Sequence, residues 1–159
     1  MVRLQRFLVP VDYSPCSGVA LRYAMFLAEK VGAEVELLHV VWEPPPYVGM
    51  EMLSATLPTR DVGTMAEYTR QMAEREMRRF VAECGLPGAD ALPRRYAEGS
   101  PTHAIVETAG QGYDLIVMGT HGRAGVSHAL LGSVAERVVR KAPCPVLTVR
   151  RDNAVPNRS

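Results

Sequence analysis

The stretch from residue 118 to residue 134 reads MGTHGRAGVSHALLGSV. It overlaps the end of the strand pattern at 114–118, which is apolar from Leu115 onward, and it ends where a helical pattern begins at Ser133. Gly119, Gly122 and Gly132 allow the backbone to approach a ligand closely. The amide groups at the start of a helix favour an anion, and Ser133 adds a hydroxyl donor. The stretch therefore predicts an anion site between a strand and a helix, of the kind that holds phosphate.

Two common phosphate-binding motifs are excluded at this site. The Walker pattern requires a lysine after its last glycine, whereas Gly132 is followed by Ser133. The dinucleotide pattern GxGxxG fails after Gly110 and Gly112, and that pair precedes a strand instead of following one. The anion site must therefore belong to another class.

Strand and helix patterns alternate along the rest of the chain. Strands are predicted at residues 7–11, 35–41, 94–97, 114–118 and 145–150, and helices at 15–31, 61–84, 101–109 and 133–142. Ser14 and Ser100 each precede a proline, which predicts a serine N-cap followed by proline at the first helical position. The two strongest strands are apolar almost throughout, which is typical of a parallel sheet covered on both faces. The pattern predicts a single-domain, three-layer α/β fold.

Residues 43–59 interrupt this alternation. Three consecutive prolines at 44–46 cannot continue a central strand, and the segment has no clear period as far as Pro58. Such a length is unusual for a loop in a compact domain, so we expect a lid or a partner-binding surface here.

Composition excludes several classes of protein. The 159 residues are enough for one domain, and the formal net charge of +1 gives no electrostatic reason to expect nucleic acid or an anionic membrane as partner. No apolar run approaches the roughly 20 residues that cross a bilayer. Cys16, Cys84 and Cys144 are odd in number and widely spaced, which suggests neither a disulfide framework nor a metal motif. We expect a cytoplasmic protein.

The glycine spacing matches a known family. Gly119, Gly122, Gly132 and Ser133 satisfy the pattern Gly-x2-Gly-x9-Gly-Ser/Thr of the universal stress proteins. Four further blocks match in the same order: VPVD at 9–12, LLHV at 37–40, DLIVMG at 114–119 and APCPVL at 142–147. The chain therefore resembles the ATP-binding type of this family, with an adenine nucleotide alpha hydrolase-like fold.

The resemblance implies a five-stranded parallel sheet of order 3-2-1-4-5 with helices on both faces. We expect residues 1–152 to form one nucleotide-binding domain and residues 153–159 to form a flexible tail. In such a sheet the first and fourth strands are neighbours where the strand order reverses, and ligands bind beyond their carboxyl ends. Asp12 follows the first strand and Gly119 ends the fourth. The resemblance and the geometric rule therefore predict the same site.

The resemblance also implies which residues meet each part of the nucleotide. The adenine is expected to lie against Pro10, Val11 and Val40. Asp12 is expected to face the base, the ribose or a bound cation. The ribose and phosphates are expected to be surrounded by Met118, Gly119, His121 and Gly122. The phosphates are expected to meet the backbone and hydroxyl of Gly132, Ser133 and Val134.

Several of the candidate residues could instead have purely structural roles. Asp12 is alternatively a helix-start residue, and Ser133 a simple N-cap. His39 is expected to be a packed strand histidine instead of a catalytic base. Cys16 lies near a helix N-terminus, where a thiol pKa can fall, but a small, partly buried structural residue is the expected role.

The leading hypothesis is an ATP-binding regulatory or stress-response protein, with Mg²⁺ or Mn²⁺ accompanying the triphosphate. A partner protein would recognise the ordered state of the 43–59 or 119–132 segment. The alternatives are a slow ATPase and a dimeric scaffold without nucleotide. Asp12 and His121 are possible groups for hydrolysis, but residues 118–134 contain no lysine and no paired carboxylates, so no catalytic residue is assigned. An apolar edge strand at 145–150 predicts a homodimer, as in members of the family.

Overall fold

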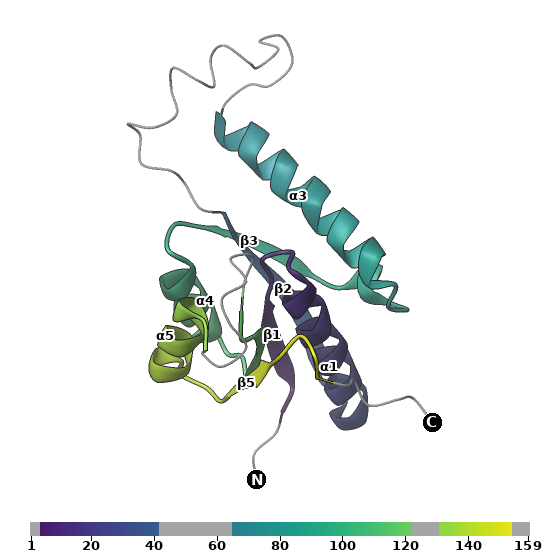
Figure 1. Cartoon of the computed structure of the whole chain (residues 1–159), viewed down its shortest axis with the longest axis vertical. Coiled ribbons are helices and arrows are strands. Elements are labelled where there is room, and N and C mark those ends of the chain that lie inside the picture. The colour runs from purple at the N-terminus through teal and green to yellow at the C-terminus, as the bar shows by residue number, and fades with distance from the viewer. Residues whose placement is uncertain (1–3, 42–64, 122–130, 154–159) are drawn as a thin grey trace.

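The computed structural model describes residues 4–41, 65–121 and 131–153 (Figure 1). Its strands are β1 (Arg6–Pro10), β2 (Glu34–Val41), β3 (Arg94–Glu98), β4 (Leu115–Gly119) and β5 (Val146–Val149). They form one sheet of order β3-β2-β1-β4-β5, and every neighbouring pair is parallel. The predicted strand order is confirmed, and each predicted strand is found within two residues of its expected ends.

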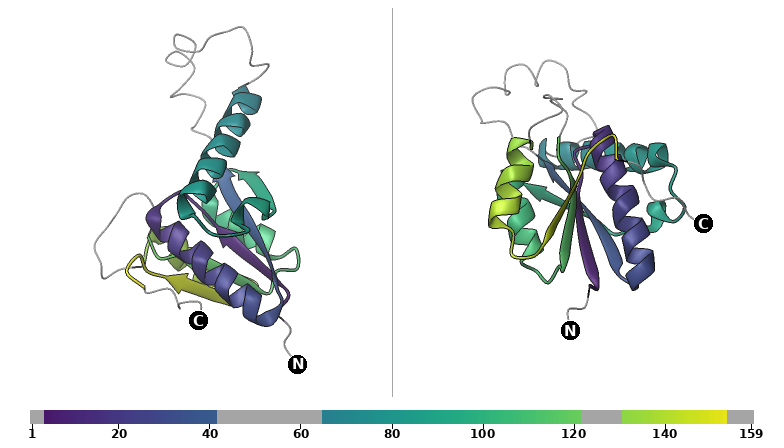
Figure 2. Two further views of the ribbon diagram at one scale, coloured as in Figure 1. Left: turned by 90° about the vertical axis from the view of Figure 1, so that its right-hand side faces the viewer. Right: turned by 60° about the horizontal axis from the view of Figure 1, so that its bottom comes forward.

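Four α-helices in the described residues cover both faces of this sheet. They are α1 (Pro15–Val31), α3 (Met65–Cys84), α4 (Pro101–Ala109) and α5 (Ser133–Lys141), with a short 3-10 helix, η1 (Ala89–Ala91). Helices α1 and α3 lie on one face, and α4 and α5 lie on the other (Figure 2). In the described parts of the chain, no helix combines the length and apolar character needed to span a membrane. The predicted α/β sandwich is confirmed.

Alternate residues of the central strands supply the two halves of the core. Phe7 and Val9 of β1 belong to the apolar cluster beneath α1 and α3, whereas Leu8 belongs to the cluster beneath α4 and α5. Leu37 and Leu38 of β2 divide in the same way. Because side chains alternate across a strand, a strand covered on both faces must be apolar at consecutive positions. This explains the unbroken apolar runs of the sequence.

The helix-start signals differ in their outcome. At α1 the hydroxyl of Ser14 accepts a hydrogen bond from the amide of Ser17 at 3.2 Å, and Pro15 occupies the first helical position, as predicted. At α4, Ser100 is the N-cap residue but its side chain makes no capping hydrogen bond. The prediction of a hydroxyl cap at Ser100 is therefore wrong, although the helix begins at the expected residue.

Helix α3 contacts the sheet mainly through its C-terminal half. Its buried side chains in the described residues are those of Ala73, Met77, Phe80 and Val81. The N-terminal part of α3 projects past the carboxyl ends of the strands (Figures 1 and 2). The predicted 43–59 segment, the first four positions of the predicted 61–84 helix and residues 154–159 of the predicted tail lie outside the described residues.

Candidate functional site

The strand order reverses between β1 and β4. Strand β1 pairs with β2 on one side and with β4 on the other, and both pairings are parallel. The carboxyl ends of β1 and β4 therefore lie side by side, and the chain leaves them toward opposite faces of the sheet. In open α/β sheets, ligands bind at such a reversal, beyond the carboxyl ends of the strands. Asp12 follows β1 and His121 follows β4, so both residues lie at this edge of the sheet.

The carboxylate of Asp12 is fixed by the first turn of α1. Its Oδ1 accepts hydrogen bonds from the amide of Ser14 at 3.1 Å and from the hydroxyl of Ser17 at 2.6 Å. The amide of Asp12 in turn donates to the Ser17 hydroxyl at 3.1 Å. Asp12 therefore has the helix-start role that the sequence left open, and this role orients its carboxylate at the carboxyl edge. Ser17 was not predicted, although the spacing Asp-x-Ser-x-x-Ser is a recognisable capping pattern.

Gly119 is required where α1 packs against β4. A Cβ atom at this position would lie 2.8 Å from Cys16 Sγ and 3.1 Å from Cys16 Cβ. The Cys16 thiol is buried and donates to the carbonyl oxygen of Val149 at 3.2 Å. That carbonyl also accepts from the amide of Thr120 at 2.9 Å. Cys16 therefore has the expected structural role, and Gly119 is glycine because the helix approaches the strand closely here.

The described ends of the 121–132 segment meet at the base of α5. The amide of Gly132 donates to the carbonyl oxygen of Thr120 at 2.7 Å, and a Cβ on Gly132 would lie 2.7 Å from the same oxygen. Gly132 is the N-cap of α5, and Ser133 is the first residue within the helix. The alternative of Ser133 as N-cap is therefore wrong. Gly122 lies outside the described residues.

Several polar groups at the start of α5 lack hydrogen-bond partners among the described residues. Gly132 has no side chain to cap α5, so the amides of the first turn have no partner within the helix. The ring of His121 lies next to Thr120, with Nδ1 2.9 Å from the threonine Oγ1. Its Nε2 is buried and has no hydrogen-bond partner among the described residues. Buried polar atoms of this kind cost free energy unless a partner satisfies them, so the site suits a ligand rich in polar groups.

The apolar residues predicted for the site are buried or half-buried at the carboxyl edge of the sheet and at the start of α5. Pro10 at the end of β1 and Val11 after it are buried, and Val11 belongs to the core cluster beneath α1 and α3. Met118 belongs to the core cluster beneath α4 and α5, and the half-buried side chains of Val40 and Val134 pack against the same cluster. The predicted base-binding and phosphate-binding residues that the structure describes therefore come from the ends of three adjacent strands and from the start of α5.

His39 is a packed strand histidine. Its Nδ1 lies 2.9 Å from the carbonyl oxygen of Val11, and its ring stacks on that of Tyr13 with the centroids 4.2 Å apart. The interpretation of His39 as a structural residue of β2 therefore agrees with its surroundings.

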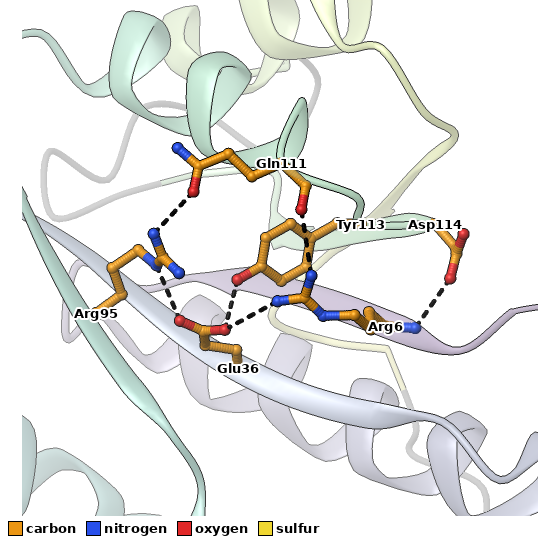
Figure 3. Close-up of polar contacts among 6 residues, drawn as sticks. All are labelled: Arg6, Glu36, Arg95, Gln111, Tyr113 and Asp114. Atoms are coloured by element: carbon orange, nitrogen blue, oxygen red, sulfur yellow. Dashed lines mark hydrogen bonds and ion pairs between the residues drawn. The ribbon is translucent and has the colours of Figure 1, made fainter.

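A second polar cluster, at the opposite edge of the sheet, was not predicted (Figure 3). Glu36 of β2 accepts from Arg95 Nε at 2.9 Å and from the Tyr113 hydroxyl, and it lies 3.6 Å from Arg6 Nη2. The Arg6 guanidinium also lies over the Tyr113 ring, 4.3 Å from its centroid. Burial raises the pKa of Glu36, but the hydrogen bonds from Tyr113 and Arg95 and the two guanidinium charges outweigh it and lower the pKa. The cluster links β1, β2, β3 and the turn before β4, so its role is structural.

Asp114 strengthens the same edge. Its Oδ2 accepts from the amides of Gln5 at 2.8 Å and Arg6 at 3.0 Å, and these hydrogen bonds lower the pKa of the carboxyl group. The bonds fix the start of β1 beside the start of β4. No group of three or more metal-ligating side chains occurs among the residues that the structure describes.

The fold defines a doubly wound α/β protein with a candidate ligand site where the strand order reverses. The chain belongs to the universal stress protein family, whose model matches residues 3–150. It is 35% identical to a universal stress protein of Methanocaldococcus jannaschii over 148 residues, which are 92% of this chain and 82% of that protein.

Solved structures share the fold. The universal stress protein UspA from Lactobacillus plantarum superposes with a TM-score of 0.71 and 28% identity, covering 94% of this chain and all of that chain (100%). A crystal structure of a universal stress protein in complex with cAMP superposes with a TM-score of 0.62 and 24% identity, covering 93% of this chain and 98% of that chain.

Proposed function

We propose that this chain is a regulatory stress protein that binds ATP in the crevice between the end of β1 and the start of α5. The observation that carries the proposal is the buried, unpartnered Nε2 of His121 next to the uncapped N-terminus of α5. A triphosphate supplies acceptor oxygens and negative charge, which this end of a helix favours. The three free thiols among the described residues are in keeping with a reducing cytoplasm.

The surrounding residues fit the remaining parts of a nucleotide. The half-buried side chain of Val40 offers an apolar surface for the adenine, whereas Val11 is buried in the core cluster beneath α1 and α3. The fixed carboxylate of Asp12 faces the ribose or a Mg²⁺ or Mn²⁺ ion carried by the phosphates, since hard cations prefer oxygen ligands. Gly132, Ser133 and Val134 would hold the phosphates through the first amides of α5 and the Ser133 hydroxyl. The cAMP complex supports the proposal only by showing one protein of this fold that holds an adenine nucleotide.

Binding is favoured over turnover. A phosphoryl-transfer enzyme needs a group that activates the attacking water and cations that stabilise the transferred phosphoryl group. Residues 118–134 contain no lysine and no carboxylate. Oδ1 of Asp12 already accepts two hydrogen bonds from α1. We therefore propose that nucleotide occupancy is a signal that a partner protein recognises.

We also propose that the chain acts as a homodimer paired through β5. The carbonyls of Pro145 and Val149 point toward β4, where they accept from the amides of Ile116 and Thr120. Because consecutive residues of a strand point their backbone groups to opposite sides, Val146 and Thr148 direct theirs to the open edge. An edge of this kind pairs readily with a second copy.

Two measurements test the nucleotide proposal. Native mass spectrometry of freshly purified protein should show a co-purified adenine nucleotide, and titration calorimetry with ATP and Mg²⁺ should show about one site per chain. The variants Asp12→Asn and Ser133→Ala should each weaken binding about ten- to hundredfold, the loss expected for one hydrogen bond to a charged group.

Matched control variants distinguish a loss of ATP binding at the site from nonspecific effects of substitution. Ser100→Ala changes the N-cap serine of α4, which makes no capping hydrogen bond, and Asp90→Asn changes an exposed carboxylate in η1. Both should bind ATP as the wild type does. A chain that neither co-purifies with nucleotide nor releases heat with millimolar ATP refutes the proposal and favours the empty scaffold. Stoichiometric phosphate release that Asp12→Asn abolishes would show a hydrolase instead.

A further inference from the structure

Tyr13 has an unusual backbone conformation. Its φ of 65° is the only positive φ of a residue other than glycine in the described part of the chain. This left-handed conformation crowds the Cβ of a bulky side chain and costs free energy unless the surroundings impose it. Tyr13 lies in the turn between Asp12 and the N-cap residue Ser14, directly at the candidate site. A glycine would adopt this conformation without strain, so contacts of the tyrosine side chain must compensate for the strain.

The side chain of Tyr13 is held by two other elements. Its ring stacks on His39 of β2, with centroids 4.2 Å apart and an interplanar angle of 23°. The ring also contacts Phe80 of α3, with centroids 5.8 Å apart. The hydroxyl donates a hydrogen bond of 3.0 Å to the carbonyl oxygen of Ala73. These contacts fix the turn after β1 against both the sheet and α3.

The hydrogen bond to Ala73 lies at the boundary between the packed and the projecting parts of α3. Ala73 is the first residue of that helix with a side chain buried among the described residues. The part of α3 before it projects beyond the carboxyl edge of the sheet (Figure 2). Tyr13 therefore contacts α3 where the packed half of the helix gives way to the projecting half.

We propose that Tyr13 is a positioning residue that couples occupancy of the nucleotide site to the docking of α3. The inference rests on the proposed function, because the turn that Tyr13 anchors carries Asp12. Nucleotide bound against Asp12 holds the turn in its strained conformation and so strengthens the contact of Tyr13 with Ala73. By linkage, a docked α3 must favour nucleotide binding by the same factor. The projecting half of α3 is then the surface by which occupancy is signalled.

Hydrogen–deuterium exchange of the full-length protein tests this coupling. Exchange is measured with and without saturating ATP and Mg²⁺, comparing peptides from α3 with peptides from α4 as an internal reference. ATP should slow exchange in α3 of the wild type. Tyr13→Phe retains the ring and loses only the hydroxyl, so it should reduce this slowing about two- to tenfold, the factor that corresponds to one hydrogen bond. Tyr13→Gly removes the strain and the side chain together, and it should abolish the effect of ATP on α3.

The control is Tyr96→Phe. Tyr96 lies on β3 and packs against the core cluster that includes residues of α3, but it does not belong to the turn. This variant should respond to ATP as the wild type does. The coupling is refuted if the wild type binds ATP by calorimetry while exchange in α3 stays unchanged, or if Tyr13→Phe and Tyr13→Gly retain the full slowing. A wild type that binds no ATP refutes the proposed function as well, so the two failures are distinguishable.

Discussion

Replacing Gly119 by alanine should destabilise the protein because α1 leaves no room for a Cβ atom. The added carbon would lie 2.8 Å from Cys16 Sγ and 3.1 Å from two further atoms of Cys16. Attractive contacts between heavy atoms are found at about 3.5–4.0 Å, so helix or strand must shift by several tenths of an ångström. Overpacking a well-packed core in this way costs about 1–3 kcal/mol.

A double-mutant cycle isolates the cause of this loss. Cys16→Ala removes the nearest clashing atom but leaves the Cβ and carbonyl carbon of residue 16 in place. We expect Cys16→Ala alone to cost about 1 kcal/mol for the lost buried sulfur. In the double variant the alanine at 119 should be partly accommodated, with a favourable coupling of about 0.5–2 kcal/mol.

Urea unfolding followed by circular dichroism measures these differences. With an m-value of about 2 kcal/mol/M, a loss of 2 kcal/mol lowers the midpoint by about 1 M. Gly110→Ala serves as the control, since Gly110 has an ordinary helical φ of −64° and its nearest contact for a Cβ is the Glu107 carbonyl at 3.3 Å. A Gly119→Ala variant as stable as the wild type, or additive costs in the cycle, would contradict the packing role of Gly119.

Three further predictions concern other parts of the fold. Glu36→Gln should lower the free energy of unfolding by about 1–2 kcal/mol at neutral pH. Hydrogen bonds and nearby guanidinium charges hold the pKa of Glu36 below its ordinary 4.5, so the carboxylate adds its full stability above pH 4.5. This stability is lost as the pH falls through the folded-state pKa of Glu36, so the urea midpoints of variant and wild type should converge in acid. A difference between the midpoints that stays constant with pH would contradict this prediction. Gly132→Val, with its Cβ 2.7 Å from the Thr120 carbonyl, should displace α5 and abolish ATP binding in calorimetry, whereas unchanged affinity would exclude α5 from the site. Thr148→Pro removes an amide on the open side of β5, so light scattering should show a dimeric wild type and a monomeric variant; a monomeric wild type at micromolar concentration refutes the dimer.

The elements of the fold could be predicted because their signals are local. Side-chain alternation and N-capping involve residues at most four positions apart, so the sequence itself contains them. Ser14 followed by Pro15 fixed the start of α1, and the apolar run at 115–118 predicted β4. The spacing of Gly119, Gly132 and Ser133 indicated where the site lies, and the family resemblance supplied the strand order.

Contacts between distant segments required the tertiary structure. Gly119 packs against Cys16, the Tyr13 hydroxyl donates to the Ala73 carbonyl, and the Tyr113 hydroxyl donates to Glu36. No sequence periodicity relates the two members of any of these pairs. Each pair forms only because the sheet brings different strands and helices to one edge. The sequence therefore determined the elements and the family, and it predicted where the candidate site lies. Only the tertiary structure decided that Gly119 serves helix packing and that Tyr13 joins the turn after β1 to α3, because these contacts depend on distances between elements.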